Sequence, residues 1–124
     1  MRKRQNDKMS RIFIDGSGWN GKNSRYAIAS ENGYHYIHKS RKKMTNNEME
    51  YLALLHALEV CENNAIILTD SRLVVGQVCQ NWKVKAENLF THVQKAKNIT
   101  SEKNVHLEWI PRGKNLAGHL LEKR

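Results

Sequence analysis

The sequence predicts an α/β fold, with a five-stranded mixed sheet made of a three-stranded antiparallel meander plus two parallel strands, and helices on both faces. Two observations predict it. Three β-prone segments follow one another before any helical pattern begins, which is typical of a meander. Two later apolar strands alternate with helical patterns, and such strands join a sheet in parallel through right-handed crossovers. The 124 residues are enough for a single hydrophobic core.

The meander is predicted from residues 11–39. "RIFID", residues 11–15, is a short and nearly continuous apolar run, which is typical of a central strand. "SRYAIAS" and "YHYIHK", residues 24–30 and 34–39, flank Asn32 and Gly33, a dipeptide that favours a tight hairpin.

The rest of the chain alternates helices and strands. Thr45 and Glu48 form the Thr-x-x-Glu pattern of a capping box. Ser71 is a good N-cap for the next helix, and Pro111 stops the last strand. The expected elements are a helix over 45–61, a strand over 65–70, helices over 72–80 and 86–100, a strand over 105–110 and a helix over 116–123.

The chain is expected to hold one domain, residues 11–124, preceded by a basic and flexible tail, residues 1–10. No apolar run approaches the roughly 18 residues of a membrane span. We therefore expect a cytoplasmic monomer that has no membrane partner. The two cysteines, Cys61 and Cys79, fall in apolar helical patterns and are expected to be small core residues.

The net charge of +9 gives the first indication of function. A small basic domain attracts polyanions, of which nucleic acid is the commonest. The basic residues include local clusters at residues 2–4, 39–43 and 83–85.

Two predicted strands end in aspartates, Asp15 and Asp70. Ligands bind at the carboxyl ends of strands in parallel α/β sheets. Either aspartate alone could instead begin a turn or cap a helix.

Glu50 favours the ligand hypothesis, because it lies at the head of an apolar helical stripe that continues through Leu54, Leu58 and Cys61. A carboxylate there is costly to bury without a partner. The helix dipole could stabilise it, but Glu48 already serves that end of the helix. Three converging carboxylates repel one another unless a cation lies between them, and oxygen ligands favour Mg²⁺ or Mn²⁺. Basic charge together with such a site indicates a nuclease.

Three phrases in the sequence resemble type 1 ribonuclease H: "DGSG" after a strand, "TNNEMEY" at a helix start and "LTDSRLVVGQV" at a strand-to-helix junction. The resemblance extends from about Arg11 to Leu121. It implies the ribonuclease H-like fold and an endonuclease that cleaves the RNA strand of RNA–DNA hybrids. It also implies two-metal-ion phosphodiester hydrolysis with Mg²⁺ or Mn²⁺, two ions per site with substrate, giving 5′-phosphate and 3′-hydroxyl products. Asp15, Glu50 and Asp70 match the first three metal ligands.

The fourth ligand of the family is usually an aspartate in the final helix, four residues after an asparagine. Asn115 plus four is His119, which we expect to be a catalytic metal ligand in its place. An inert replacement is the alternative; a register through Gly118 supplies no ligand, and Glu122 is a poorly placed substitute. An imidazole ligand removes one negative charge and shifts metal preference toward Mn²⁺. The segment "PRGKN" carries no loop histidine, so histidine-assisted product release is not expected.

Eight residues are candidates for substrate binding, on the resemblance and on their polar or basic character. The asparagine amides suit recognition of a 2′-hydroxyl, although they could equally cap the helix. Ser71 could likewise be only a helix cap. Trp82, next to Lys83 and Lys85, could be a core residue or part of a basic-aromatic surface for the DNA strand. The eight are Gly16, Ser17, Asn46, Asn47, Ser71, Lys83, Lys85 and Arg112.

Two other functions compete with the hybrid nuclease. A catalytically degenerate module of the same fold that binds hybrid or RNA is supported only by the departure at His119. A 3′–5′ exonuclease of related fold is disfavoured, because such enzymes carry Asp-x-Glu in the first motif and this chain has Ser17 there.

Overall fold

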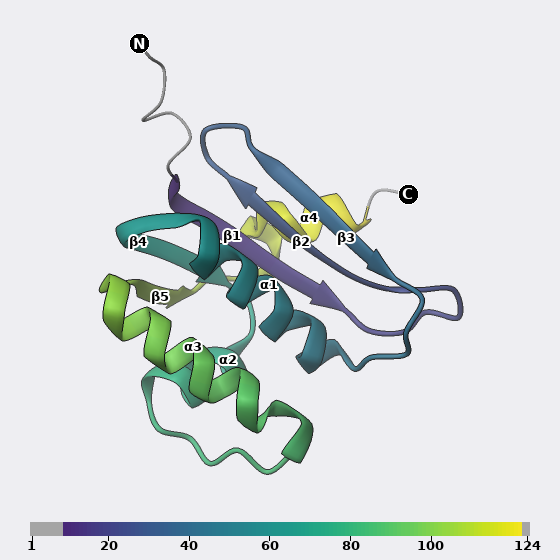
Figure 1. The fold of residues 1–124 in the computed structure, drawn as a ribbon. Coiled ribbons are helices and arrows are strands. Elements are labelled where there is room, and N and C mark those ends of the chain that lie inside the picture. The colour runs from purple at the N-terminus through teal and green to yellow at the C-terminus, as the bar shows by residue number, and fades with distance from the viewer. Residues whose placement is uncertain (1–8, 123–124) are drawn as a thin grey trace.

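The computed structural model of the chain describes residues 9–122. The chain forms one five-stranded sheet in the order β3-β2-β1-β4-β5, with antiparallel pairing among the first three strands and parallel pairing of β4 with β1 and of β5 with β4. This is the predicted α/β architecture (Figure 1). The strands are β1 (Met9–Ser17), β2 (Ser24–Ser30), β3 (His35–Ser40), β4 (Cys61–Thr69) and β5 (His106–Trp109).

Helices cover both faces of the sheet, three on one face and one on the other (Figure 1). The larger core lies under the first three helices, and the smaller core, which includes Phe13 and Leu121, lies under the last. The helices are α1 (Asn46–Val60), α2 (Arg72–Cys79), α3 (Phe90–Lys103) and α4 (Leu116–Glu122), with short 3-10 turns at Glu87–Leu89 and Arg112–Lys114. None of the helices within residues 9–122 is long and apolar enough to cross a membrane.

The local signals for α1 and the hairpin are confirmed. Thr45 caps α1 in a full capping box, in which the Glu48 carboxylate accepts from the Thr45 amide at 2.8 Å and the Glu48 amide donates to the Thr45 hydroxyl at 3.0 Å. Gly33 in the β2–β3 turn has a positive φ of 101°, which glycine adopts without strain.

The first and fourth strands are longer than predicted. Met9 and Ser10, which the sequence analysis assigned to the tail, belong to β1, and Met9 pairs with Cys61 across the sheet. The pairing then shifts register, so that Arg11 faces Ile66, and Asn64 takes a positive φ of 67° within this irregular stretch. Residues 1–8, the rest of the predicted tail, lie outside the described residues.

One prediction about a buried side chain is wrong, for a reason of helix phase. Cys79 is exposed, because the inward face of α2 carries Val74, Gln77 and Val78 and the next residue lies about 100° further round the helix. Phe90 is 50% exposed, because residues Leu89 and Val93, four apart, face the core instead. Cys61 is buried as predicted.

Candidate active site

The close packing of β1 against α1 builds the centre of the site. A Cβ atom on Gly16 would lie 2.3 Å from the Glu50 amide nitrogen, so only glycine allows this approach of strand and helix. Gly18 is held against the same helix end, because its amide donates to the Asn46 side-chain oxygen at 2.6 Å. These contacts bring Asp15, at the end of β1, to Glu50, in the first turns of α1.

Asp70 joins them from the end of β4, the strand that pairs in parallel with β1. The carboxylates of Asp15, Glu50 and Asp70 each offer an oxygen that lies within 4.8 Å of the other two. They lie in a polar pocket of about 430 Å³ at the carboxyl ends of these strands. The predicted convergence of the three acids is confirmed in the fold.

Burial and mutual repulsion disfavour the charged forms of the acids in this cluster. Glu50 is only 7% exposed, and its Oε1 atom has no hydrogen-bond partner. Burial, followed by the charge of Asp15, raises the pKa of Glu50 to about 9. Burial is also the largest cause that raises the pKa of Asp15, to about 6, while the Arg112 charge lowers it. An unpartnered buried carboxylate oxygen beside two other carboxylates is the arrangement that a divalent cation relieves.

The donor set therefore fits a hard cation. Three carboxylates supply only oxygen ligands, which suit Mg²⁺ and Mn²⁺. Asp15, Glu50 and Asp70 are the residues that would hold it.

Asn115 fixes the geometry around Asp70. Its side chain is fully buried, and its Nδ2 atom donates to an Asp70 carboxylate oxygen at 3.1 Å and to the Ile14 carbonyl at 2.9 Å. Its Oδ1 atom accepts from the Ala117 amide at 3.0 Å, which caps α4. One side chain thus ties β1, Asp70 and α4 together. The indole of Trp109 also contacts this loop, since its Nε1 donates to the Asp70 carbonyl at 3.1 Å.

The structure does not bring His119 into the acidic cluster. His119 is exposed, and it belongs neither to the described lining of the pocket nor to the group of three carboxylates. Gly118, one residue earlier, faces the site instead, since a Cβ there would lie 3.2 Å from an Asp15 carboxylate oxygen. Glu122 also lines the pocket. Metal ligation by His119 stays a prediction, and this conformation of α4 does not provide it.

Six of the eight substrate-binding candidates line the pocket, and two do not. The amide oxygen of Asn46 accepts from Gly18 rather than capping α1, because Thr45 fills the cap position. Ser71 does cap α2, accepting from the Val74 amide at 3.2 Å, and lines the pocket as well. The six are Gly16, Ser17, Asn46, Asn47, Ser71 and Arg112.

Lys83 and Lys85 lie elsewhere, exposed on the segment between α2 and α3. Beside them, Trp82 covers Gly76 of α2, where a Cβ would fall 2.1 Å from the indole, yet Trp82 is 46% exposed. Trp82 therefore packs against α2 with part of its indole and leaves the rest exposed to solvent.

Two residues at the site, Asn115 beside Asp70 and Arg25 in the pocket lining, were not assigned a role from the sequence. Asn115 served there only as a spacing marker, although an asparagine before a short helix is a capping signal. Arg25 lines the pocket from β2 and is only 9% exposed. The only indication of this role for Arg25 in the sequence is its charge within a strand whose other residues are small or mostly apolar, "SRYAIAS".

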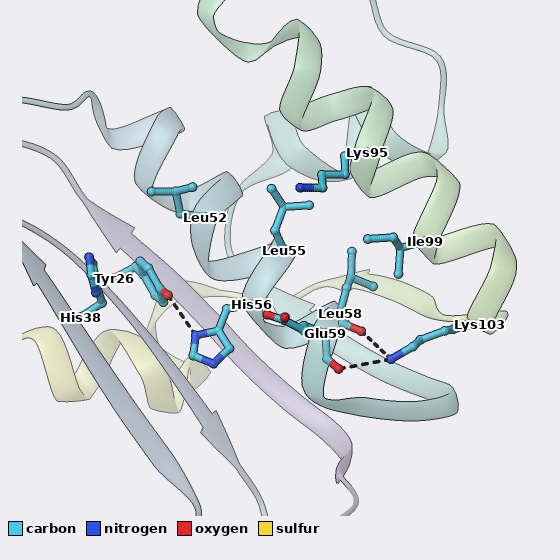
Figure 2. Close-up of a pocket in the computed structure, with 10 residues that line it drawn as sticks. All are labelled: Tyr26, His38, Leu52, Leu55, His56, Leu58, Glu59, Lys95, Ile99 and Lys103. Carbon is cyan, nitrogen blue, oxygen red and sulfur yellow. Dashed lines mark hydrogen bonds between the residues drawn. The ribbon is translucent and has the colours of Figure 1, made fainter.

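A second hollow, of about 720 Å³, lies between α1, α3 and the β2–β3 part of the sheet (Figure 2). Leucines and Ile99 form much of its wall, and three of its polar side chains have partners: the Tyr26 hydroxyl lies 2.9 Å from Nδ1 of His56, and the Lys103 ammonium donates to the Leu58 carbonyl at 2.7 Å. None of the predicted site residues is among its described lining residues.

Comparisons with known proteins agree with the fold. The bifunctional protein Rv2228c of Mycobacterium tuberculosis is 35% identical over 78 residues, which are 59% of this chain and 21% of that protein. An uncharacterised protein of Mycobacterium bovis, Mb2253c, matches to the same extent. The chain thus spans about a fifth of the length of these curated relatives (21%).

Two solved structures cover nearly the whole chain. The N-terminal RNase H domain of Rv2228c from M. tuberculosis, solved as a fusion with maltose binding protein, has a TM-score of 0.71 and 26% identity, covering 85% of this chain and 84% of that one. LC11-RNase H1 in complex with RNA/DNA hybrid has a TM-score of 0.73 and 28% identity, covering 90% and 91%. The family model for RNase H matches residues 7–119. That match covers most of the chain, and the chain therefore belongs to the RNase H family.

Proposed function

We propose that this protein is a metal-dependent endonuclease that cleaves the RNA strand of RNA–DNA hybrids. The observation that carries the proposal is the cluster of Asp15, Glu50 and Asp70, with oxygens within 4.8 Å and a buried Glu50 oxygen that lacks a partner. Family membership supports the nuclease class, and a related RNase H1 bound to RNA/DNA hybrid supports the substrate.

The bound cations would supply Lewis acidity toward the phosphodiester and lower the pKa of the attacking water. The chain's own residues supply the rest. The three carboxylates would hold the cations, and Asn115 fixes the orientation of Asp70. The expected products carry 5′-phosphate and 3′-hydroxyl ends.

The pocket also offers groups for recognising RNA. The Asn47 amide and the Ser17 hydroxyl line the pocket beside the acids and can both donate to and accept from a ribose 2′-hydroxyl. Arg112, exposed at the pocket rim, can bind a phosphate. These groups recognise backbone rather than bases, so we expect cleavage with little sequence preference.

The test is an end-labelled RNA annealed to DNA, incubated with the protein in Mg²⁺ and separately in Mn²⁺. Single-stranded RNA and duplex RNA are the controls. Internal cuts in the hybrid alone support the proposal, and a strong preference for Mn²⁺ would favour ligation by His119. Cleavage of all three substrates would contradict hybrid specificity.

One observation favours a second function, a hybrid-binding module without turnover. The residue at the fourth ligand position, His119, is exposed and outside the acidic cluster. Retarded migration of the hybrid without cleavage in either metal would support this function. The buried, repulsive acids argue against it, because a pure binder of polyanions gains nothing from them.

A further inference from the structure

Arg25 occupies a position in the pocket that sequence reasoning did not assign. It pairs directly with Ser17 across the β1–β2 ladder, and Asp15 pairs two positions along with Ala27. Side chains directly opposite on an antiparallel pair, and those diagonal to them, lie on one face. Arg25 therefore shares its face with Ser17 and Asp15, on the side that α4 covers, and it lines the pocket of the three acids.

The surroundings of Arg25 satisfy it only in part. The side chain is about nine-tenths buried, at 9% exposure. Its Nη1 atom donates to the Leu121 carbonyl of α4 at 3.1 Å, whereas its Nε atom is buried without a hydrogen-bond partner. A guanidinium stays charged at any ordinary pH and carries five donors in a rigid fork.

A simple structural role explains only one of those donors. Carbonyls in the last turn of a helix lack partners, and the bond from Nη1 to Leu121 satisfies one of them. A neutral donor would serve that carbonyl without the burden of a buried charge. Burying a charged group whose Nε has no partner is unfavourable, unless an anion completes the site when it binds.

We propose that Arg25 is a phosphate-binding residue of the catalytic pocket, which takes a non-bridging oxygen of the nucleic-acid strand that enters beside Ser17 and Asp15. This rests on the proposed function for the identity of the polyanion. The rigid fork suits phosphate, since arginine binds such groups through two parallel hydrogen bonds. The buried Arg25 is preorganised for this contact, in contrast to the exposed Arg112 on the same pocket.

The experiment measures binding rather than cleavage. A fluorescent RNA–DNA hybrid is titrated with the wild-type protein and with Arg25→Gln and Arg25→Lys in EDTA, by anisotropy, at several salt concentrations. Arg25→Gln should weaken binding by about ten-fold, the loss expected for one charge-assisted hydrogen bond. It should also reduce the slope of log K against log salt by about 0.7 to 0.9, the change for one phosphate contact. Arg25→Lys should keep the slope and lose several-fold in affinity, because lysine cannot make the paired contact.

Arg11→Gln is the matched control. It removes the same charge from the same sheet but from an exposed pair with Glu31, so both the affinity and the slope should stay close to wild type. A folded Arg25→Gln variant with unchanged affinity and slope would overturn the inference and leave Arg25 as a clamp for α4. If Arg25→Gln fails to fold, Arg25→Lys decides, since wild-type affinity in that variant contradicts a paired phosphate contact.

The same titration separates this inference from the proposed function. Wild-type protein that binds hybrid through Arg25 but does not cut it in Mg²⁺ or Mn²⁺ would refute the nuclease and leave the phosphate site standing. Wild-type protein that does not bind hybrid would overturn the phosphate site.

Discussion

The acidic pocket and the hollow between α1 and α3 differ in whether their buried polar groups have hydrogen-bond partners. The larger, shown in Figure 2, has about 720 Å³, and its Tyr26, His56 and Lys103 side chains all have partners within the protein. The smaller, about 430 Å³, holds a Glu50 oxygen and an Arg25 nitrogen that are buried without partners.

Volume therefore does not identify the functional site in this protein. Buried polar groups in native proteins nearly always have partners, so each exception needs an explanation. In the acidic pocket, the exceptions are a carboxylate oxygen of Glu50 and the guanidinium Nε of Arg25, for which we propose a cation and a phosphate as the missing partners. Among the polar groups named in the larger hollow, none lacks a partner, so we expect its interactions to contribute to stability.

The largest expected difference between the two hollows is in the loss of hybrid-cleavage rate when one acidic side chain is neutralised in each. Asp70→Asn should lower the rate of hybrid cleavage by on the order of a thousand-fold, because losing a cation ligand removes several kcal/mol of transition-state stabilisation. Glu59→Gln, a matched change in the larger hollow, should leave the rate unchanged. Single-turnover cleavage measures both, and equal losses would contradict the assignment of the site.

The pH dependence of stability should follow the acids. The pKa values of Asp15 and Glu50 are raised in the folded protein, from 3.8 to about 6 and from 4.5 to about 9. The folded state thus holds more protons than the unfolded state above pH 4, and its stability falls as pH rises toward 9. In EDTA we expect a loss on the order of a few kcal/mol across that range. Added Mg²⁺ should reverse much of the loss above pH 6, because the cation replaces the protons.

Thermal unfolding at a series of pH values measures this effect. Glu50→Gln should flatten the dependence, and Glu59→Gln should not. A profile in which wild-type stability rises between pH 5 and pH 9 in EDTA would contradict the raised pKa values.

Asn115→Ala should affect both stability and rate. Losing the buried hydrogen bonds to Asp70, Ile14 and Ala117 costs about 1–3 kcal/mol of stability. The freed Asp70 carboxylate should lower kcat by about 10- to 100-fold, as for other groups that orient metal ligands. Asn98→Ala, on the exposed side of α3, is the control. A destabilised Asn115→Ala with wild-type kcat would show that Asn115 only caps α4.

His119→Asp should raise Mg²⁺-dependent cleavage several-fold, because it restores a hard, negative ligand at the position that the resemblance assigns. His35→Asp, at an exposed position on β3, controls for the change in net charge. Unchanged metal dependence in His119→Asp would remove this residue from the mechanism.

The smallest effect is expected in the larger hollow. Tyr26→Phe removes the hydroxyl that lies 2.9 Å from His56 and should lower stability by about 0.5–1.5 kcal/mol. Hybrid cleavage should not change. Calorimetry measures the stability and the cleavage assay measures the rate. A large loss of cleavage would contradict the assignment of the active site to the acidic pocket alone.

The fold and the acidic cluster were largely predictable, because their signals are local. The capping box at Thr45 and Glu48 fixes where α1 begins, and the apolar stripe behind Glu50 fixes which way that side chain faces. The parallel pairing of β1 with β4 then brings Asp15 and Asp70 to one edge.

The error at Cys79 arose because this residue lies beside a periodic pattern of buried positions rather than on it. Cys79 and Phe90 are apolar and adjacent to buried positions, yet each is rotated out of the core by one helical step. Successive helix residues lie about 100° apart around the axis, and residue type alone does not show which of two adjacent apolar residues faces the core. Packing of the helix against the sheet decides it.

The sequence by itself determined the order of strands and helices and the three acids at their ends, since these depend on periodicity and capping within a few residues. Only the tertiary structure decided the roles of Arg25, Asn115 and the α4 residues. Arg25 and Asn115 are held at the site by hydrogen bonds to partners 96 and 101 residues away in the chain, the Leu121 and Ile14 carbonyls. The rotation of α4 places Gly118, rather than His119, toward Asp15. Contacts between distant segments depend on how helix and sheet pack, and no local pattern encodes that packing.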